Sequence, residues 1–535
     1  MQQALDRLPA GSSRSGGAAR ALAVVERAFD RAFARANPWR HLGALGFFFF
    51  WIATATGIYL YIFFDTSVDG AYRSVDALTR DQWYAGGVMR SLHRYASGAM
   101  VVAVVLHLMK ELVAGRFAGF RWFSWLSGVP LLWLLSASGV VGYWLVWDEL
   151  AQFVAIALAE WLDALPLFSD PLVRNFAMPE GVNDRLFTLL VFLHVGVPLA
   201  LLAGMFVHIQ RVNFAGVTPP RALAWGTFAA LLALSAIAPA VSHAPADLAG
   251  APQALALDWL YLAPLVLVYA FSPQAVWWLA AGVTLTLALL PFVVRRPVEP
   301  VARFDLANCN GCARCFDDCP YGAVVMRPRA DGRSGQQHAE VIPALCASCG
   351  ICTGACPSST PFRISERLAT GIDMPQQPID GVRARLERAL GQLAGERRVV
   401  VFGCDHGAEV ARLRRLDVAP LSLLCIGMLP PSFIEYALRQ GADGVLIAAC
   451  RGGECAYRLG NTWLEERLAG GREPRLRPTV ARARVRFAEA GPGEEAALAD
   501  ALAAFRAVLS AMRPNPPRRF SRRRRRLPAM QQGTE

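Results

Sequence analysis

The sequence predicts a multidomain protein: an all-α transmembrane bundle of about six helices, then a cysteine-rich α+β domain, then a small α/β domain. Three observations lead to this fold class. The chain has 535 residues, too many for one domain, and 54% of them are hydrophobic. Its first 300 residues contain apolar runs long enough to cross a bilayer. All twelve cysteines follow residue 308.

The transmembrane bundle is predicted from six apolar segments that contain no Asp, Glu or Lys. They are 42–64, 92–108, 123–147, 186–209, 222–241 and 275–294. A further apolar piece, 259–271, is too short to span and is expected to lie half-buried at the outer face. Basic residues follow segments two, four and six, whereas acidic residues follow segments one and three. The positive-inside rule therefore predicts a multi-pass protein of the cytoplasmic (inner) membrane with both termini in the cytoplasm.

Two of these segments carry the same unusual pair of histidines. His93 and His107 lie fourteen residues apart in the second segment, and His194 and His208 lie fourteen apart in the fourth. Fourteen residues rise roughly 21 Å along a helix and return to within about 40° of the starting face. A single buried histidine is usually a hydrogen-bonded core residue. Two helices with matching pairs favour ligands, because four unpaired imidazoles in hydrocarbon are costly.

The histidine pattern predicts two b-type haems between the second and fourth helices. His93 and His194 would bind one iron toward the outer face, and His107 and His208 the other toward the cytoplasm. The two histidines of one helix are too far apart to share an iron.

Residues 37–300 resemble the cytochrome b family of quinol-oxidising bc-type complexes. The resemblance is carried by NPWRHLGALG in the first helix, Arg90 with His93, GYWLVW at 142–147, Arg185, His194, Pro198 and His208. LDWLYLAP, at 257–264, is similar to the segment beside the family's outer quinol site. The resemblance implies that quinone or quinol is the substrate and that Asp258 accepts a quinol proton. A helix-start residue in solvent is the alternative reading of Asp258. Homodimers, as cytochrome b complexes form, are a further expectation.

The first eight cysteines occur in two runs typical of two-cluster ferredoxins, CNGCARCFDDCP and CASCGICTGACP. In such runs three close cysteines hold one [4Fe-4S] cube and the fourth reaches the other cube. The first cube is therefore assigned Cys309, Cys312, Cys315 and Cys356, and the second Cys346, Cys349, Cys352 and Cys319. The doubled motif with its prolines argues against zinc.

The last four cysteines lie in a region of short β-like and helical runs that begins near Arg397. This pattern predicts a small α/β domain with a partly parallel sheet. Its FGC, CIGM, GADGVLIAACRGGEC and YRLGN stretches resemble the delta subunit of methyl-viologen-reducing hydrogenase. That resemblance implies a [2Fe-2S] cluster and a heterodisulfide-reductase-like flavin and iron-sulfur partner. The four cysteines are Cys404, Cys425, Cys450 and Cys455. Buried structural thiols are the alternative.

Seven segments follow from these patterns. They are a basic N-terminal segment 1–36 with a short surface helix, a four-helix haem domain 37–215, two further transmembrane helices with the quinol-site-like segment 216–300, a two-[4Fe-4S] domain 301–370, the α/β domain 397–485, a helix 486–512 and a basic disordered tail 513–535. The net charge of +12 owes much to this tail, which is expected to contact anionic lipid. No nucleic-acid partner is expected.

Two functional classes fit this organisation. The first is a quinone- or quinol-linked oxidoreductase subunit, active within a complex, that links quinone through two haems to the cytoplasmic clusters and a soluble partner. The second is a non-catalytic anchor or redox sensor that recruits a cytoplasmic partner. The unbroken series of cofactor motifs favours the first class, because the sequence contains no signature of a signalling output domain.

Overall fold

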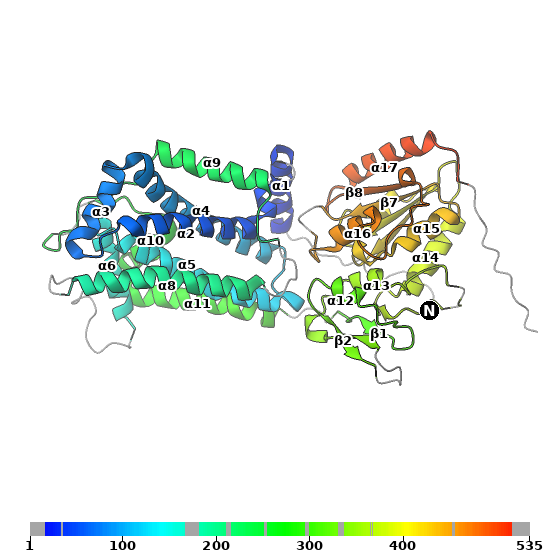
Figure 1. Cartoon of the computed structure of the whole chain (residues 1–535), viewed down its shortest axis with the longest axis horizontal. Helices are drawn as coiled ribbons and strands as arrows, with labels where there is room; N and C mark the ends of the chain where they lie inside the picture. The colour runs from blue at the N-terminus through cyan, green and yellow to red at the C-terminus, as the bar shows by residue number, and fades with distance from the viewer. Residues whose placement is uncertain are drawn as a thin grey trace, which may run out of the picture. The chain divides into compact units, whose positions relative to one another are not determined.

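The computed structural model describes residues 17–33, 36–165, 181–209, 216–250, 254–294, 299–329, 336–363, 365, 367–451 and 455–515. Within it the chain divides into two compact units, Ser12–Val298 and a unit that begins at Glu299. The first unit is helical and the second contains both helices and strands (Figure 1). The predicted disordered tail from residue 516 onward lies outside the described residues.

The helical unit contains five helices long and apolar enough to cross a membrane, among the described residues. They are α2 (Leu42–Phe63), α4 (Val88–Val113) with the π-helical turn Trp83–Gly87 before it, α5 (Trp122–Trp144), α8 (Asp184–Ile209) and α11 (Pro273–Val293). The segment predicted as a further span forms α9 (Arg221–Ile237), which has 17 residues. It ends early because Ala238 precedes a proline and adopts φ −131° and ψ 72°, outside the helical region.

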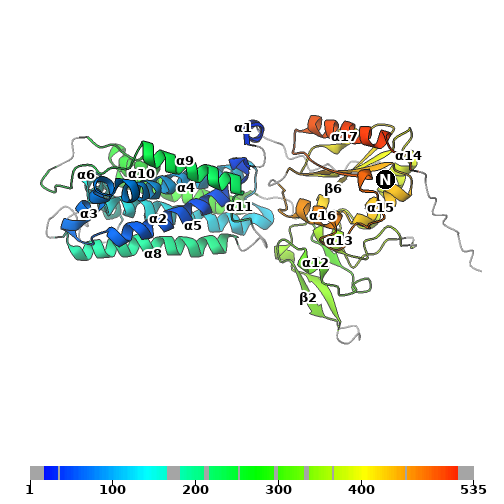
Figure 2. The ribbon, with the colours of Figure 1, turned by 45° about the horizontal axis from the view of Figure 1, so that its top comes forward.

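The bundle is organised as helix pairs. Helix α2 packs along α4, α5 packs along α8, and α9 lies beside α4 (Figures 1 and 2). Phe49, Leu92 and Leu201 contribute to a shared apolar core of the bundle. The predicted short piece forms α10 (Trp259–Ala270), which packs against α11 and against the helix Glu149–Asp163 (α6).

Two helices between the spans were not predicted from the sequence. They are α3 (Val68–Arg80) and α6 (Glu149–Asp163), which lie at one end of the bundle (Figure 1). Each begins with a side-chain cap, because Ser67 accepts a hydrogen bond from Gly70 N and Asp148 accepts one from Ala151 N. Both were overlooked because they are too short to span a bilayer and begin with acidic residues.

The helix predicted near the N-terminus is α1 (Gly17–Phe33). Glu26 on this helix forms an ion pair of 2.8 Å with Lys110 of α4, and Lys110 also donates to Trp39 O at 2.7 Å. Asn37 donates to Glu26 O at 3.1 Å. These contacts hold α1 at the end of the bundle opposite to α3 and α6 (Figure 1).

The second unit begins with the cysteine-rich α+β part. Its elements are β1 (Arg303–Phe304), α12 (Arg314–Asp317), β2 (Val324–Pro328), β3 (Gln337–Val341), α13 (Ile351–Ala355) and β4 (Ile372–Asp373). Strands β2 and β3 form an antiparallel hairpin, and β1 pairs with β4. Each short helix contains the third cysteine of its motif, and α12 and α13 contact each other, so the two motifs lie side by side.

The C-terminal part is an α/β layer with a four-stranded sheet in the order β6-β5-β7-β8. Every pairing is parallel, so the sheet is more regular than the partly parallel sheet expected. Its elements are α14 (Ile379–Gln392), β5 (Val399–Cys404), β6 (Val418–Leu423), α15 (Pro431–Arg439), β7 (Gly444–Ala449), α16 (Gly460–Ala469), β8 (Val485–Glu489) and α17 (Glu495–Ser510). Helix α17 is the C-terminal part of the helix predicted at 486–512. The start of that predicted helix is instead strand β8, because Val485–Glu489 pairs with β7. Phe505 of α17 packs on the sheet core with Leu446 and Val399.

Candidate cofactor sites

The histidines of α4 and α8 face each other across the bundle. The ring centres of His93 and His194 lie 6.1 Å apart. Two imidazoles that bind one metal ion from opposite sides, with bonds of about 2.0 Å each, have ring centres roughly 6 Å apart. The side chains bridge two helices whose backbones are not packed together, because the close helix pairs are α2 with α4 and α5 with α8. The residues present therefore fit a metal or haem iron bound between them.

Hydrogen bonds orient three of these rings. His93 Nδ1 lies 2.9 Å from Ala53 O, and His194 Nδ1 lies 3.0 Å from Ser138 O. A carbonyl oxygen can only accept, so each Nδ1 carries the proton and donates, which leaves Nε2 with its lone pair available for a ligand bond. His208 Nδ1 lies 3.1 Å from Ser127 Oγ, a hydroxyl that donates in turn to Ser124 O.

Four glycines that were not predicted from the sequence as part of the site make room for the four rings. A Cβ at Gly57 of α2 would lie 3.0 Å from His93 Cε1, and one at Gly142 of α5 would lie 2.8 Å from His194 Cε1. Gly43 and Gly128 take the same positions beside His107 and His208, at 3.7 and 3.2 Å. The glycines on each helix are fourteen residues apart, like the histidines they face. That repeated spacing is the signal that could have found them.

Asp258 lies in a polar cluster beside the His93 end of α4. Its carboxylate caps α10 by accepting from Leu260 N at 2.8 Å, and it also accepts a hydrogen bond from the Tyr143 hydroxyl. The Arg94 guanidinium lies 3.9 Å from Asp258 Oδ2 and 5.5 Å from the centre of the Tyr143 ring. Since the Asp258 side chain is only 15% exposed, it is a helix cap held among polar partners, and it is not the solvent-exposed residue of the alternative reading.

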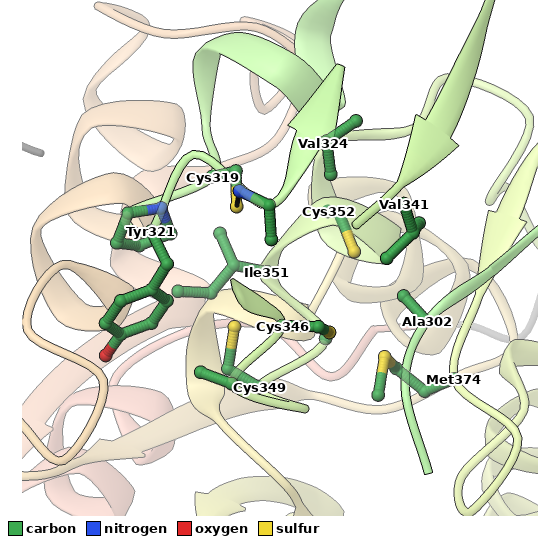
Figure 3. A pocket seen from close by; sticks show the side chains of 14 residues that line it. Ala302, Cys319, Tyr321, Val324, Val341, Cys346, Cys349, Ile351, Cys352 and Met374 are labelled. Atoms are coloured by element: carbon green, nitrogen blue, oxygen red, sulfur yellow. Dashed lines mark hydrogen bonds between the residues drawn. The ribbon is translucent and has the colours of Figure 1, made fainter. Parts of the chain in front are cut away.

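The cysteines of the two ferredoxin-like motifs line two separate cavities. One cavity is lined by Cys319 together with Cys346, Cys349 and Cys352, as seen in Figure 3. The other is lined by Cys356 together with Cys309, Cys312 and Cys315. Each cavity thus combines three cysteines of one motif with the last cysteine of the other. This is the donor set that a [4Fe-4S] cube requires, so the residues present fit two such clusters.

Burial makes these thiols poor acids when no metal is bound. It raises the pKa of the Cys315 thiol to about 12 and also raises the pKa values of Cys319, Cys349 and Cys352. A bound metal would offset this cost, because metal coordination deprotonates a thiol. Cys312 is exposed, whereas all the cysteines of the Cys319 cavity except Cys346 are buried.

The last four cysteines form a closed ring of thiols. Cys450 Sγ donates to Cys404 Sγ at 3.2 Å, too long for a disulfide bond. Cys425 lies close to both Cys404 and Cys455, and Cys450 also lies close to Cys455. The interactions with Cys425 and Cys450 lower the pKa of the Cys404 and Cys455 thiols, whereas the interactions with Cys404 and Cys455, together with burial, raise the pKa of the Cys425 and Cys450 thiols. Thiolates are the form that binds metal, so four converging thiols fit a small iron-sulfur centre.

Apolar helices with facing histidines, followed by three convergent cysteine sets, define a membrane-bound electron-transfer subunit. Comparison with protein families supports this class and specifies it. Residues 32–216 match the family model for cytochrome b/b6/petB, residues 308–360 that for a 4Fe-4S dicluster domain, and residues 395–513 that for the delta subunit of methyl-viologen-reducing hydrogenase. The chain is a fusion of three segments similar to these families, as the sequence predicted.

A solved structure described as "Hyperthermophilic respiratory Complex III" also matches the chain. The sequence identity is 18%, the match covers 52% of this chain and 82% of that one, and the TM-score is 0.41.

Proposed function

We propose that the chain conducts electrons through the membrane between quinone and cytoplasmic iron-sulfur centres, as the quinone-linked subunit of a larger oxidoreductase. The observation that carries this proposal is the facing pair of imidazoles, 6.1 Å apart, between helices whose backbones do not pack together. Two histidines with a purely structural role need not have their ring centres at this distance, whereas two histidines that bind the same iron must.

Two b-type haems would be held by this bundle. His93 and His194 bind the outer one, and His107 and His208 the inner one. When bound, the haems supply one-electron redox chemistry within the membrane. The protein would orient three of the histidine ligands through the hydrogen bonds from Nδ1 to Ala53 O, Ser138 O and Ser127 Oγ, and the four glycines leave space for the histidine rings.

Asp258 is the residue that would accept the proton of a quinol when quinol is oxidised, and the same carboxyl group would return a proton when electrons flow to quinone. The bonds from Leu260 N and Tyr143 fix the direction of its carboxylate, and Arg94 lies close enough to stabilise the negative charge. The cluster lies next to His93 in sequence and space, because Arg94 follows His93 directly and Tyr261 of α10 donates to Ser97 O at 3.1 Å. A quinol bound there could release its proton close to the outer haem.

The cysteine-rich unit would hold three iron-sulfur centres. Cys309, Cys312, Cys315 and Cys356 bind the first cube, Cys346, Cys349, Cys352 and Cys319 bind the second, and Cys404, Cys425, Cys450 and Cys455 bind a [2Fe-2S] cluster. The cavities and the thiol ring described above support this assignment.

The cytoplasm is the proposed location of both termini and of the iron-sulfur unit, on the basis of the loop charges. The proposed partner is a heterodisulfide-reductase-like flavin and iron-sulfur protein that docks near Cys450 and Cys455. Ferredoxin-type cubes commonly have low potentials and b haems higher ones, so electrons would flow from the partner to quinone. Inward flow would be opposed by about 2.3 kcal/mol per 100 mV of membrane potential, negative inside.

The experiment is to add quinol and, separately, a low-potential reductant to the purified full-length chain in lipid nanodiscs. We expect two b-type haem components in the difference spectrum and haem reduction by quinol. Absence of haem absorbance, or haems that do not respond to quinol, would overturn the proposal and favour the anchor or sensor.

A further inference from the structure

A buried ion network joins the two cysteine-bearing parts of the second unit. Arg467 of α16 has no exposed surface, donates from Nη1 to Gly427 O at 2.8 Å, and pairs through Nη2 with Asp318. Arg472 binds the other oxygen of Asp318 at 2.5 Å, and Trp463 Nε1 donates to Asp318 O at 3.1 Å. A buried charge that loses its partner is strongly destabilising, so the network fixes these segments to one another.

Both segments that Arg467 holds lead directly to cysteines. Asp318 precedes Cys319, which lines the cavity of the second cube. Gly427 lies two residues after Cys425, in the short helical turn Ile426–Met428. One side chain therefore sets the distance between a ligand segment of the second cube and a ligand segment of the C-terminal thiol ring.

Helix α13, which contains Cys352, packs against the turn Ile426–Met428 with its backbone in direct contact. A Cβ at Gly354 would overlap Gly427 O and would lie 2.8 Å from Arg467 Nη1. A Cβ at Gly427 would lie 3.1 Å from Ile351 Cγ1. The backbone of α13 thus touches the backbone that follows Cys425, and glycine is needed on both sides.

The cavity of the first cube lies nearer the tip of the β2–β3 hairpin, where it is lined by the paired residues Met326 and Ala339. Val324 and Val341, which pair at the base of the hairpin, line the cavity of the second cube. Cys312 of the first cavity is exposed. Figures 1 and 2 both show α13 next to α16, with β2 farther from the C-terminal layer.

We propose that the second cube, and not the first, exchanges electrons with the C-terminal cysteine centre, and that Arg467 is the positioning residue for this exchange. The inference rests on the cysteine assignment of the proposed function. The exchange moves one electron: the donor centre is oxidised by one and the acceptor centre is reduced by one, and no bond forms or breaks. Dithionite supplies the electrons in the test below, and the exposed first cube would be the outward port of the unit.

The test is electron paramagnetic resonance of the full-length protein reduced with dithionite, with iron and sulfide measured per chain. In the unsubstituted protein we expect magnetic coupling between the C-terminal centre and one cube. Cys346→Ser, which disables the second cube, should abolish this coupling, whereas Cys312→Ser, which disables the first, should retain it. The opposite selectivity would overturn the inference while leaving the cysteine assignment intact.

The positioning role is tested by Arg467→Lys, whose single ammonium group cannot reproduce the fork that reaches both Gly427 and Asp318. We expect iron and sulfide to be retained and the coupling to be lost or weakened. Arg383→Lys is the control, because Arg383 is also buried and paired, with Asp380 of α14 at 2.7 Å. If Arg467→Lys fails to fold, Asp318→Asn tests the same contact. Unchanged magnetic coupling in Arg467→Lys or in Asp318→Asn would overturn the positioning role of Arg467. An unsubstituted protein without iron-sulfur signals would overturn the cysteine assignment as well.

Discussion

Gly142→Ala should selectively weaken haem binding at the outer histidine pair. The new Cβ would lie 2.8 Å from His194 Cε1 and 3.3 Å from its Nδ1. Carbon atoms in favourable contact are about 3.5–4.0 Å apart, so the ring must move by roughly 0.7 Å or more. It is not free to move, because Nδ1 is bonded at 3.0 Å to Ser138 O on the same helix as the new methyl group.

The expected loss of haem-binding free energy can be estimated from measured effects of overpacking. Adding a methyl group to a well-packed interior costs about 1–3 kcal/mol, equivalent to roughly 5- to 150-fold weaker binding of the haem. Alanine favours a helix over glycine by about 1 kcal/mol, but that gain stabilises α5 itself and does not restore the position of the His194 ring.

Gly43→Ala is the matched control for this prediction. The substitution is the same and also faces a predicted ligand, but its Cβ would lie 3.7 Å from His107 Cε1, an ordinary contact. Haem per chain and redox titration of the two b components should show one component lost or shifted in Gly142→Ala and neither altered in Gly43→Ala. Equal effects in the two variants, or loss of the inner component from Gly142→Ala, would refute the reasoning.

Three further predictions test the proposed sites. His107→Ala and His208→Ala should each remove the same b component from the difference spectrum and leave the other, because one iron is shared; loss of different components would contradict the pairing. Cys319→Ser should alter the paramagnetic signal of the second cube and largely spare the first, and the reverse would mean that each motif closes on its own cluster. Asp258→Asn should retain both haems yet slow haem reduction by quinol about 10²-fold or more, as expected for a lost proton acceptor. If stopped-flow spectroscopy shows that quinol reduces the haems of this variant at the unsubstituted rate, Asp258 does not have that role.

Much of the membrane unit could be predicted because helix geometry repeats. A fixed rise and turn per residue are enough to place His93 and His107 on one face of a helix from their spacing alone. The same regularity does not by itself identify the four glycines, because an isolated glycine in an apolar run has many explanations. Helix α9 was predicted too long, since hydropathy continues past Ile237 although Pro239 ends the helix.

The relation between the cysteine sets could be predicted only within each motif. Local spacing places Cys319 with the second cube, but the contact of Asp318 with Arg467 joins residues 149 positions apart. Nothing in the spacing or hydropathy of either segment marks that pair, because a buried arginine and a surface arginine look alike in sequence. Its recognition requires the folded chain.

The repeated spacing in the bundle means that each helix sets the separation of the two predicted haem sites as well as supporting them. Histidines on α4 and α8 and glycines on α2 and α5 all recur at fourteen residues. One residue inserted between His93 and His107 would turn the later ring by about 100° away from both its opposite histidine and its glycine. Residues within these intervals that contact neither a histidine nor Asp258 can therefore vary, whereas an insertion or deletion would displace one histidine from its opposite histidine and its glycine. The distance between the two sites, roughly 21 Å, is set by residue count and not by residue identity.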